Sequence, residues 1–171
     1  MDARSRSLLL AVLLVVTPLF ACKKMQEKAA EKAAEKAAEK VVESQTGGKV
    51  DLSSDGGVTF KDDKGNTYQA GGGAKLPADW PSDIPAYPGA SILVAASTPQ
   101  GKVVSMETTD DASKVFDFYK SKLSSYKKDA ELDMGEGKVI SFSSDKLTVS
   151  ITIGKSGDKT NVSLTVSPKL G

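Results

Sequence analysis

The sequence predicts an α+β fold: a small, mostly antiparallel sheet domain with one packed helix, preceded by a signal peptide and an extended Ala/Glu/Lys helix. Near the C-terminus, three segments alternate apolar and polar residues with the period of two that is typical of half-buried strands. Before them, apolar residues recur at helical spacing over 112–127. At the other end, an apolar run leads into a low-complexity Ala/Glu/Lys segment. A chain of 171 residues therefore has room for one domain and an appendage.

The N-terminal segment has the features of a secretory signal. Arg4 and Arg6 make its start positive, and a mostly apolar run of thirteen residues follows from Leu8 to Phe20. This run is shorter than the roughly 20 residues that a membrane-spanning helix needs. A short apolar run after a basic start predicts a signal peptide over residues 1–21.

The run ends in Leu19-Phe20-Ala21-Cys22, which resembles the lipobox of bacterial lipoproteins. The resemblance implies cleavage between Ala21 and Cys22 and lipidation of Cys22, with a diacylglyceryl group and often a third chain such as palmitate. Cys22 is the only cysteine of the chain, which makes the match specific. Two alternatives stay open: an ordinary secreted protein cut after Ala21, and an uncleaved anchor helix.

Lipidation at Cys22 would hold the protein on a membrane, because two or more acyl chains bind firmly where one binds marginally. In the best-known sorting rule for such proteins, aspartate after the cysteine retains them at the inner membrane. Lys23 occupies that position. We therefore expect a location in the cell envelope, at the outer membrane where the cell has one.

Residues 22–46 predict a lipid-anchored helical spacer. The segment from Gln26 to Lys40 repeats Glu-Lys-Ala-Ala with a period of four, and all three residue types favour helix. We expect a helix from about Lys24 to Ser44, roughly 30 Å long and closed by Gly47. The period of four turns the alanine stripe around the axis, unlike a coiled-coil seam. A semi-rigid spacer is the main interpretation; a weakly oligomerising helix and a partly frayed segment are the alternatives.

Residues 47–75 predict a Gly-rich hairpin region. Val58–Phe60 and Thr67–Ala70 have the pattern of paired strands, and Lys49–Leu52 predicts a third short strand. Gly71–Gly73 has the composition of a linker.

The loop between the two paired strands contains Asp62, Asp63 and Asn66, residue types that bind calcium. It lacks the alternation and the closing glutamate of a calcium-binding hand, so we predict a turn.

An α+β head domain is expected over residues 76–171. It begins with an irregular, proline-rich segment over 76–90, in which we expect Trp80, Ile84 and Tyr87 to pin the segment to the domain. An exposed aromatic ligand site is the alternative for these side chains.

The rest of the head alternates strand and helix patterns. Thr109-Asp110-Asp111 offers a helix cap and acids for a first helical turn. The helix is expected over 112–127, with an apolar stripe that includes Phe116 and Leu123. Five mostly antiparallel strands are expected at 91–97, 103–107, 139–143, 147–153 and 160–166.

The stretch Trp-Pro-Ser-Asp-Ile-Pro-Ala-Tyr-Pro-Gly-Ala at residues 80–90 resembles one that precedes the first strand in a domain of uncharacterised bacterial lipoproteins. The resemblance covers roughly residues 76–167, and it implies no known activity.

Composition restricts the chemistry of the head. The chain has 23 basic and 22 acidic residues, which argues against nucleic acid as a partner. It has no histidine, and its one cysteine is the expected lipidation site, so we predict no metal and no cofactor. The remaining catalytic candidates are the carboxylates Asp110 and Asp111, for which helix capping is the simpler interpretation, and the helix-surface pairs Ser113-Lys114 and Ser121-Lys122. We therefore do not expect an enzyme.

These observations predict a membrane-anchored lipoprotein with a non-catalytic binding or envelope-associated head, held off the membrane by its spacer. Its partner would be an envelope protein or the cell wall. Two alternatives remain: an accessory subunit of an envelope assembly complex, and a carboxylate-dependent enzyme.

Overall fold

The computed structural model describes residues 36–37, 39–41, 43–44, 47–135 and 137–169. The predicted signal peptide, its cleavage site at Ala21 and Cys22, and most of the predicted spacer lie outside these residues. The chain divides into two compact units, residues 1–38 and 39–171. Within the part of the chain that the structure describes, no helix is both long and apolar enough to span a bilayer.

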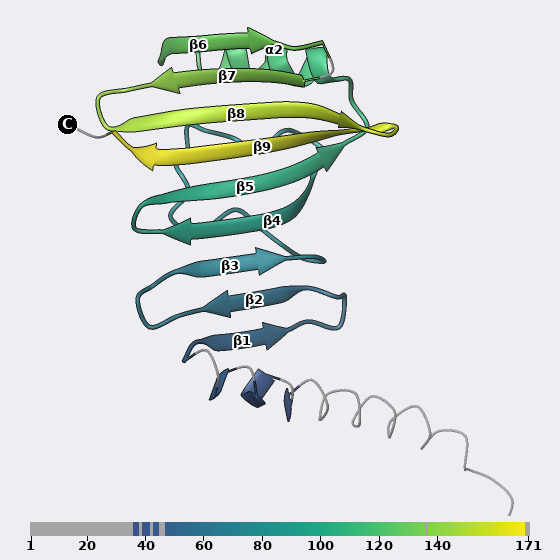
Figure 1. The fold of residues 1–171 in the computed structure, drawn as a ribbon, viewed down its shortest axis with the longest axis vertical. Helices are drawn as coiled ribbons and strands as arrows, with labels where there is room; N and C mark the ends of the chain where they lie inside the picture. Colours follow the sequence, from purple (N-terminus) through teal and green to yellow (C-terminus); the bar gives the residue numbers. More distant parts are fainter. Residues whose placement is uncertain (1–35, 38, 42, 45–46, 136, 170–171) are drawn as a thin grey trace, which may run out of the picture. The chain divides into compact units, whose positions relative to one another are not determined.

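The second unit contains an antiparallel sheet of nine strands, the helix α2 and, before β1, the described helical residues 39–41 and 43–44 (Figure 1). Across the sheet the strand order is β1-β2-β3-β4-β5-β9-β8-β7-β6. The bounds are β1 Lys49–Leu52, β2 Val58–Lys61, β3 Thr67–Ala70, β4 Ser91–Thr98, β5 Gly101–Thr108, α2 Ala112–Lys122, β6 Lys127–Asp133, β7 Gly137–Ser143, β8 Leu147–Ser156 and β9 Lys159–Pro168. The predicted α+β class is confirmed.

The sheet is larger than the five strands that the sequence predicts. The three short strands of the hairpin region form as expected, but β3 pairs with β4, with Tyr68 opposite Ala96. The sheet therefore continues across the predicted boundary between residues 75 and 76. The strand that the sequence did not predict is β6, whose seven residues are all exposed. It has no apolar face of its own and is a strand because it pairs with β7.

The helix is shorter than predicted. α2 ends at Lys122, and Leu123 is its C-terminal cap, with φ −100° and ψ 23°. The Tyr126 amide then bonds to the Leu123 carbonyl oxygen in a turn, and the chain enters β6 at Lys127. The predicted apolar stripe nevertheless packs into the core: Leu123 is fully buried, and Tyr126, beyond the helix, is partly buried against the core.

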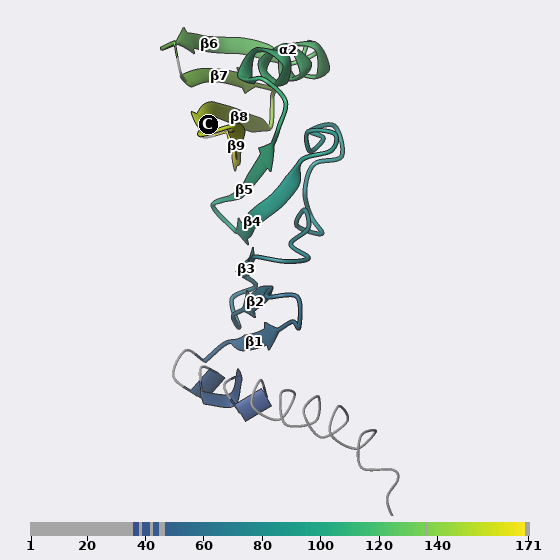
Figure 2. The same ribbon diagram turned by 90° about the vertical axis from the view of Figure 1, so that its right-hand side faces the viewer.

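The core lies on one face of the sheet. Figure 2 shows α2 and the proline-rich connection between β3 and β4 on the same side. Beneath them, alternate residues of β5, β9, β8 and β7 are buried, as the period of two predicts. The fully or nearly fully buried apolar residues of these strands are Val104, Met106, Val162, Leu164, Val166, Val149, Ile151, Ile153, Ile140 and Phe142.

The three glycines after β3 are not a linker. A Cβ on Gly72 would lie 2.3 Å from the backbone oxygen of Asp55, and one on Gly57 would lie 2.1 Å from the backbone oxygen of Gly72. The two turns therefore pack backbone against backbone, which only residues without side chains permit. The Gly71 amide also donates a 3.0 Å hydrogen bond to the Leu93 carbonyl oxygen in β4.

Candidate functional site

The acidic pair at the start of α2 does not act as the predicted cap. Asp111 occupies the N-cap position, but its side chain makes no capping hydrogen bond, and the first turn of α2 contains no acidic residue. Only the backbone of Asp111 takes part in the start of the helix: its carbonyl oxygen accepts a 3.2 Å hydrogen bond from the Val115 amide. The capping prediction is therefore wrong about both side chains.

Asp110 instead joins the proline-rich connection to the helix. Its carboxylate accepts hydrogen bonds of 2.7 Å from the Tyr87 hydroxyl and 3.0 Å from the Lys114 ammonium. These bonds favour the ionised form, so they hold the pKa of Asp110 below its usual value, with the Tyr87 bond as the largest cause. Burial and the neighbouring carboxylate raise the pKa of Tyr87 to about 12.

A polar depression of about 230 Å³ lies beside this pair, where the start of α2 meets the β8–β9 turn. Asp110, Asp111 and Asp158 line it together with Lys155 and Lys159. A general acid needs a carboxyl that retains its proton near neutral pH. Asp110 has the opposite tendency, so its geometry suits an ionic anchor and does not support acid catalysis.

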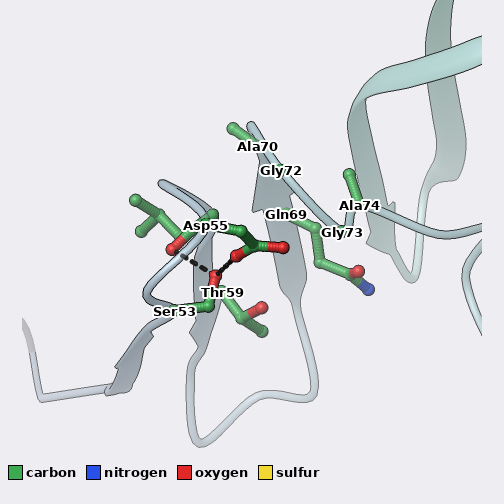
Figure 3. A pocket seen from close by; sticks show the side chains of 10 residues that line it. Ser53, Asp55, Thr59, Gln69, Ala70, Gly72, Gly73 and Ala74 are labelled. Atoms are coloured by element: carbon green, nitrogen blue, oxygen red, sulfur yellow. Dashed lines mark hydrogen bonds between the residues drawn. The ribbon is translucent and has the colours of Figure 1, made fainter.

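A second depression, of about 170 Å³, lies between the two glycine turns (Figure 3). The Ser53 hydroxyl bonds to the Asp55 carboxylate and to the Gly57 carbonyl oxygen, and the pKa of Asp55 is lowered, chiefly by the bond from Ser53. Thr59 and Gln69 complete the polar lining. Ser53 and Asp55 are already occupied in holding their own turn together, so the depression offers hydrogen-bonding surface without an activated nucleophile.

The proline-rich connection is pinned to the domain as predicted. Ile84 and Tyr87 are buried, and the Trp80 indole donates a 2.6 Å hydrogen bond to the Ile84 carbonyl oxygen. Two further side chains fasten this segment: the Tyr119 hydroxyl bonds to the Pro85 carbonyl oxygen, and the Tyr126 hydroxyl to Asp83. The aromatic residues of this segment therefore pack against the core and hold the connection on the domain.

Asp62 forms the predicted turn rather than a calcium site. Its carboxylate accepts hydrogen bonds from the backbone amides of Lys64 and Asn66 and from the Asn66 side chain. No cluster of three or more potential metal-binding side chains occurs among the described residues.

The sheet face opposite α2 carries an apolar surface that was not predicted from the sequence. Strand register aligns Val50, Phe60, Tyr68 and Ala96 across β1–β4. A second row follows two residues along: Leu52, Val58, Ala70 and Val94. We call these two rows the outer apolar face. Tyr68 is 43% exposed and Val58 37%. The alternation in each short strand was the available signal, but only the register shows that the alternate residues align.

One comparison with known proteins gives a match. Residues 90–168 match a family model described as START domain-like. This stretch, just under half of the chain, contains β4–β9 and α2 and is similar to that family in sequence. It leaves out β1–β3 and nearly all of the proline-rich connection. No curated protein matches the chain.

Proposed function

We propose that this chain is a bacterial lipoprotein, fixed to a membrane through lipid on Cys22, whose head is a non-catalytic binding module of the cell envelope. The observation that carries the proposal is the position of the sole cysteine, directly after Leu19-Phe20-Ala21 at the end of a short apolar run. The compact unit over 39–171 supports it, since the described residues of the head build a hydrophobic core among themselves.

The test is the full-length Cys22→Ser variant, expressed in a bacterium that lipidates such proteins and compared with the natural chain. The natural chain should take up labelled palmitate, lose the mass of residues 1–21 and enter the detergent phase on phase separation. The variant should take up no label and remain an uncut precursor or become a soluble product.

The two alternatives give other results. A secreted protein cut after Ala21 is soluble in both forms, and an uncleaved anchor keeps its leader mass in both. A variant that enters the detergent phase with the normal mature mass would refute the lipoprotein proposal.

A second candidate, an accessory subunit of an envelope assembly complex, is favoured by the outer apolar face. Exposed apolar and aromatic side chains on neighbouring strands are typical of surfaces that another protein covers.

The double variant Val58→Lys/Tyr68→Lys would place two charges on the outer apolar face. An accessory subunit should migrate in a large complex on native gels of mild detergent extracts, and the variant should leave that complex. A Lys64→Glu control, in the exposed β2–β3 turn, should not. A head that acts alone migrates alike in all three forms.

A further inference from the structure

The edge of the sheet at β1 is closed by side chains rather than by a strand. Residues 36–37, 39–41 and 43–44 are helical, and Gly47 ends the helix as predicted, with φ +69° and a 2.9 Å bond from its amide to the Glu43 carbonyl oxygen. Beyond this turn the chain runs back along the helix as β1. The Leu52 amide donates a 2.9 Å hydrogen bond to the Glu39 carboxylate, and the Val50 amide donates a 3.2 Å bond to the Glu43 carboxylate.

The repeat of four residues explains this fit. Glutamates four apart on a helix are separated by about 6 Å along its axis. The outward amides of a strand recur every second residue, at about 6.6–6.8 Å. Glu39 and Glu43 therefore meet Val50 and Leu52 as a matched pair. Both glutamates are half-buried, whereas Lys36, Lys40 and Val41 on the same helix are exposed.

An open sheet edge is a template for pairing with another chain, and proteins block such edges in various ways. At the opposite edge, β6 has five charged residues among its seven, Lys127, Lys128, Asp129, Glu131 and Asp133. β1 has only Lys49 and Asp51, which alternate with Val50 and Leu52. The protection of the β1 edge against pairing with another chain therefore depends on Glu39 and Glu43.

We propose that Glu39 and Glu43 close the β1 edge and that, when they are withdrawn, β1 pairs antiparallel with β1 of a second copy of this chain. The sequence of β1 fits pairing about a two-fold axis at Val50. Each Val50 then faces the other, and each Lys49 lies opposite an Asp51. Opposite charges in such positions stabilise a pair of strands. The two outer apolar faces would join into one surface.

The closure is tested by amide hydrogen exchange on the full chain, which reports on each amide separately. Two single variants then distinguish the contact of Glu39 from that of Glu43. Glu39→Ala should raise the exchange rate of the Leu52 amide about tenfold or more, and Glu43→Ala should do so for the Val50 amide, since each loses a bond to a charged acceptor. The amides of Lys49 and Asp51, which face β2, should keep their rates. If the Val50 and Leu52 rates do not change, the closure does not exist.

The pairing is tested by the protein mass of the full chain in detergent micelles, measured by light scattering. Glu39→Ala/Glu43→Ala should double the mass relative to the natural chain. Glu39→Gln/Glu43→Gln should not, because an amide oxygen still accepts the hydrogen bond. Lys36→Ala/Lys40→Ala, with the same spacing and with side chains that are exposed, is the matched control and should also leave the mass unchanged.

The register is tested by charge exchange in the alanine double variant. Asp51→Lys should abolish the doubled mass, and Lys49→Asp/Asp51→Lys should restore it. An unchanged mass in the alanine variant, a doubled mass in the glutamine variant, or a dimer indifferent to Asp51→Lys would each overturn the proposal.

Discussion

Among single residues, Tyr87 connects the most parts of the head. Its ring packs edge-on against Phe118 of α2 with the ring centroids 5.1 Å apart, its amide contacts the Met106 sulfur of β5, and its hydroxyl bonds to Asp110. Tyr87 is buried, with only 5% of its surface accessible to solvent. The connection, the helix and the sheet therefore share one hydrogen-bonded tyrosine.

We expect Tyr87→Phe to lower the free energy of unfolding at pH 8 by about 1.5 kcal/mol, the typical value of a hydrogen bond to a charged group. The raised pKa of Tyr87, about 12 against 10 in the unfolded chain, gives the sign of the pH dependence. The neutral hydroxyl contributes stability below pH 10, and this contribution is lost as the pH rises towards 12. The difference between the natural chain and the variant should therefore shrink from pH 8 to pH 11.

Urea unfolding at the two pH values measures this difference. Tyr68→Phe, at an exposed site on the outer apolar face, is the control and should leave stability at pH 8 within about 0.5 kcal/mol. A Tyr87→Phe chain as stable as the natural one at pH 8 would contradict the importance of the bond to Asp110.

Among the elements, the glycine turn after β3 packs against the turn between β1 and β2. The φ angle of Gly72 lies outside the left-handed region. In an ordered turn with room for a Cβ, its replacement by alanine would therefore stabilise the protein by about 0.4–1 kcal/mol. In the folded chain the new Cβ would meet the Asp55 backbone oxygen at 2.3 Å. We therefore expect Gly72→Ala to destabilise the protein, by about 1–3 kcal/mol for a clash between backbones.

Urea unfolding with a matched variant tests this. Gly154 in β8 has no positive φ and open space around the new Cβ, so Gly154→Ala should be neutral or stabilise the protein by up to about 1 kcal/mol. If Gly72→Ala proves neutral or stabilising, the two turns do not pack as the structure has them.

For the whole molecule, the proposed spacer makes length more important than the order of its side chains. Deleting residues 27–38 removes three whole Glu-Lys-Ala-Ala repeats and about 18 Å of helix, and it retains Glu39 and Glu43. We expect the melting temperature of the head to stay unchanged and the cellular function to be lost. A shuffled Ala/Glu/Lys segment of equal length should restore that function.

Complementation of a strain lacking the protein, together with crosslinking in cells, distinguishes the spacer from an oligomerising helix. The oligomerising helix predicts that shuffling abolishes crosslinked dimers and function together. Loss of function in the shuffled variant would refute the spacer.

Much of the head could be predicted from the sequence, because the relevant patterns are local. Val149, Ile151 and Ile153 alternate with polar residues, and the strand and its buried face follow from that alternation alone. The spacing of Val115, Phe116 and Tyr119 likewise predicts both the helix and the side that it buries. Local patterns also predict the short strands β1, β2 and β3 and the anchoring of Tyr87 in the core. The lipid anchor at Cys22 is also a sequence prediction, and it awaits its experiment.

The tertiary structure decided what depends on partners distant in the sequence. Lys127–Asp133 has no strand pattern, and only its pairing with β7 makes it one. The glycines after β3 have the composition of a linker, and only the backbone of Asp55 beside them shows a packed turn. Asp110 has the sequence position of a helix cap, but the hydroxyl of Tyr87, 23 residues earlier, gives it another role. Local patterns specify which residues a strand or helix buries, whereas register, edges and ion pairs depend on which segments meet.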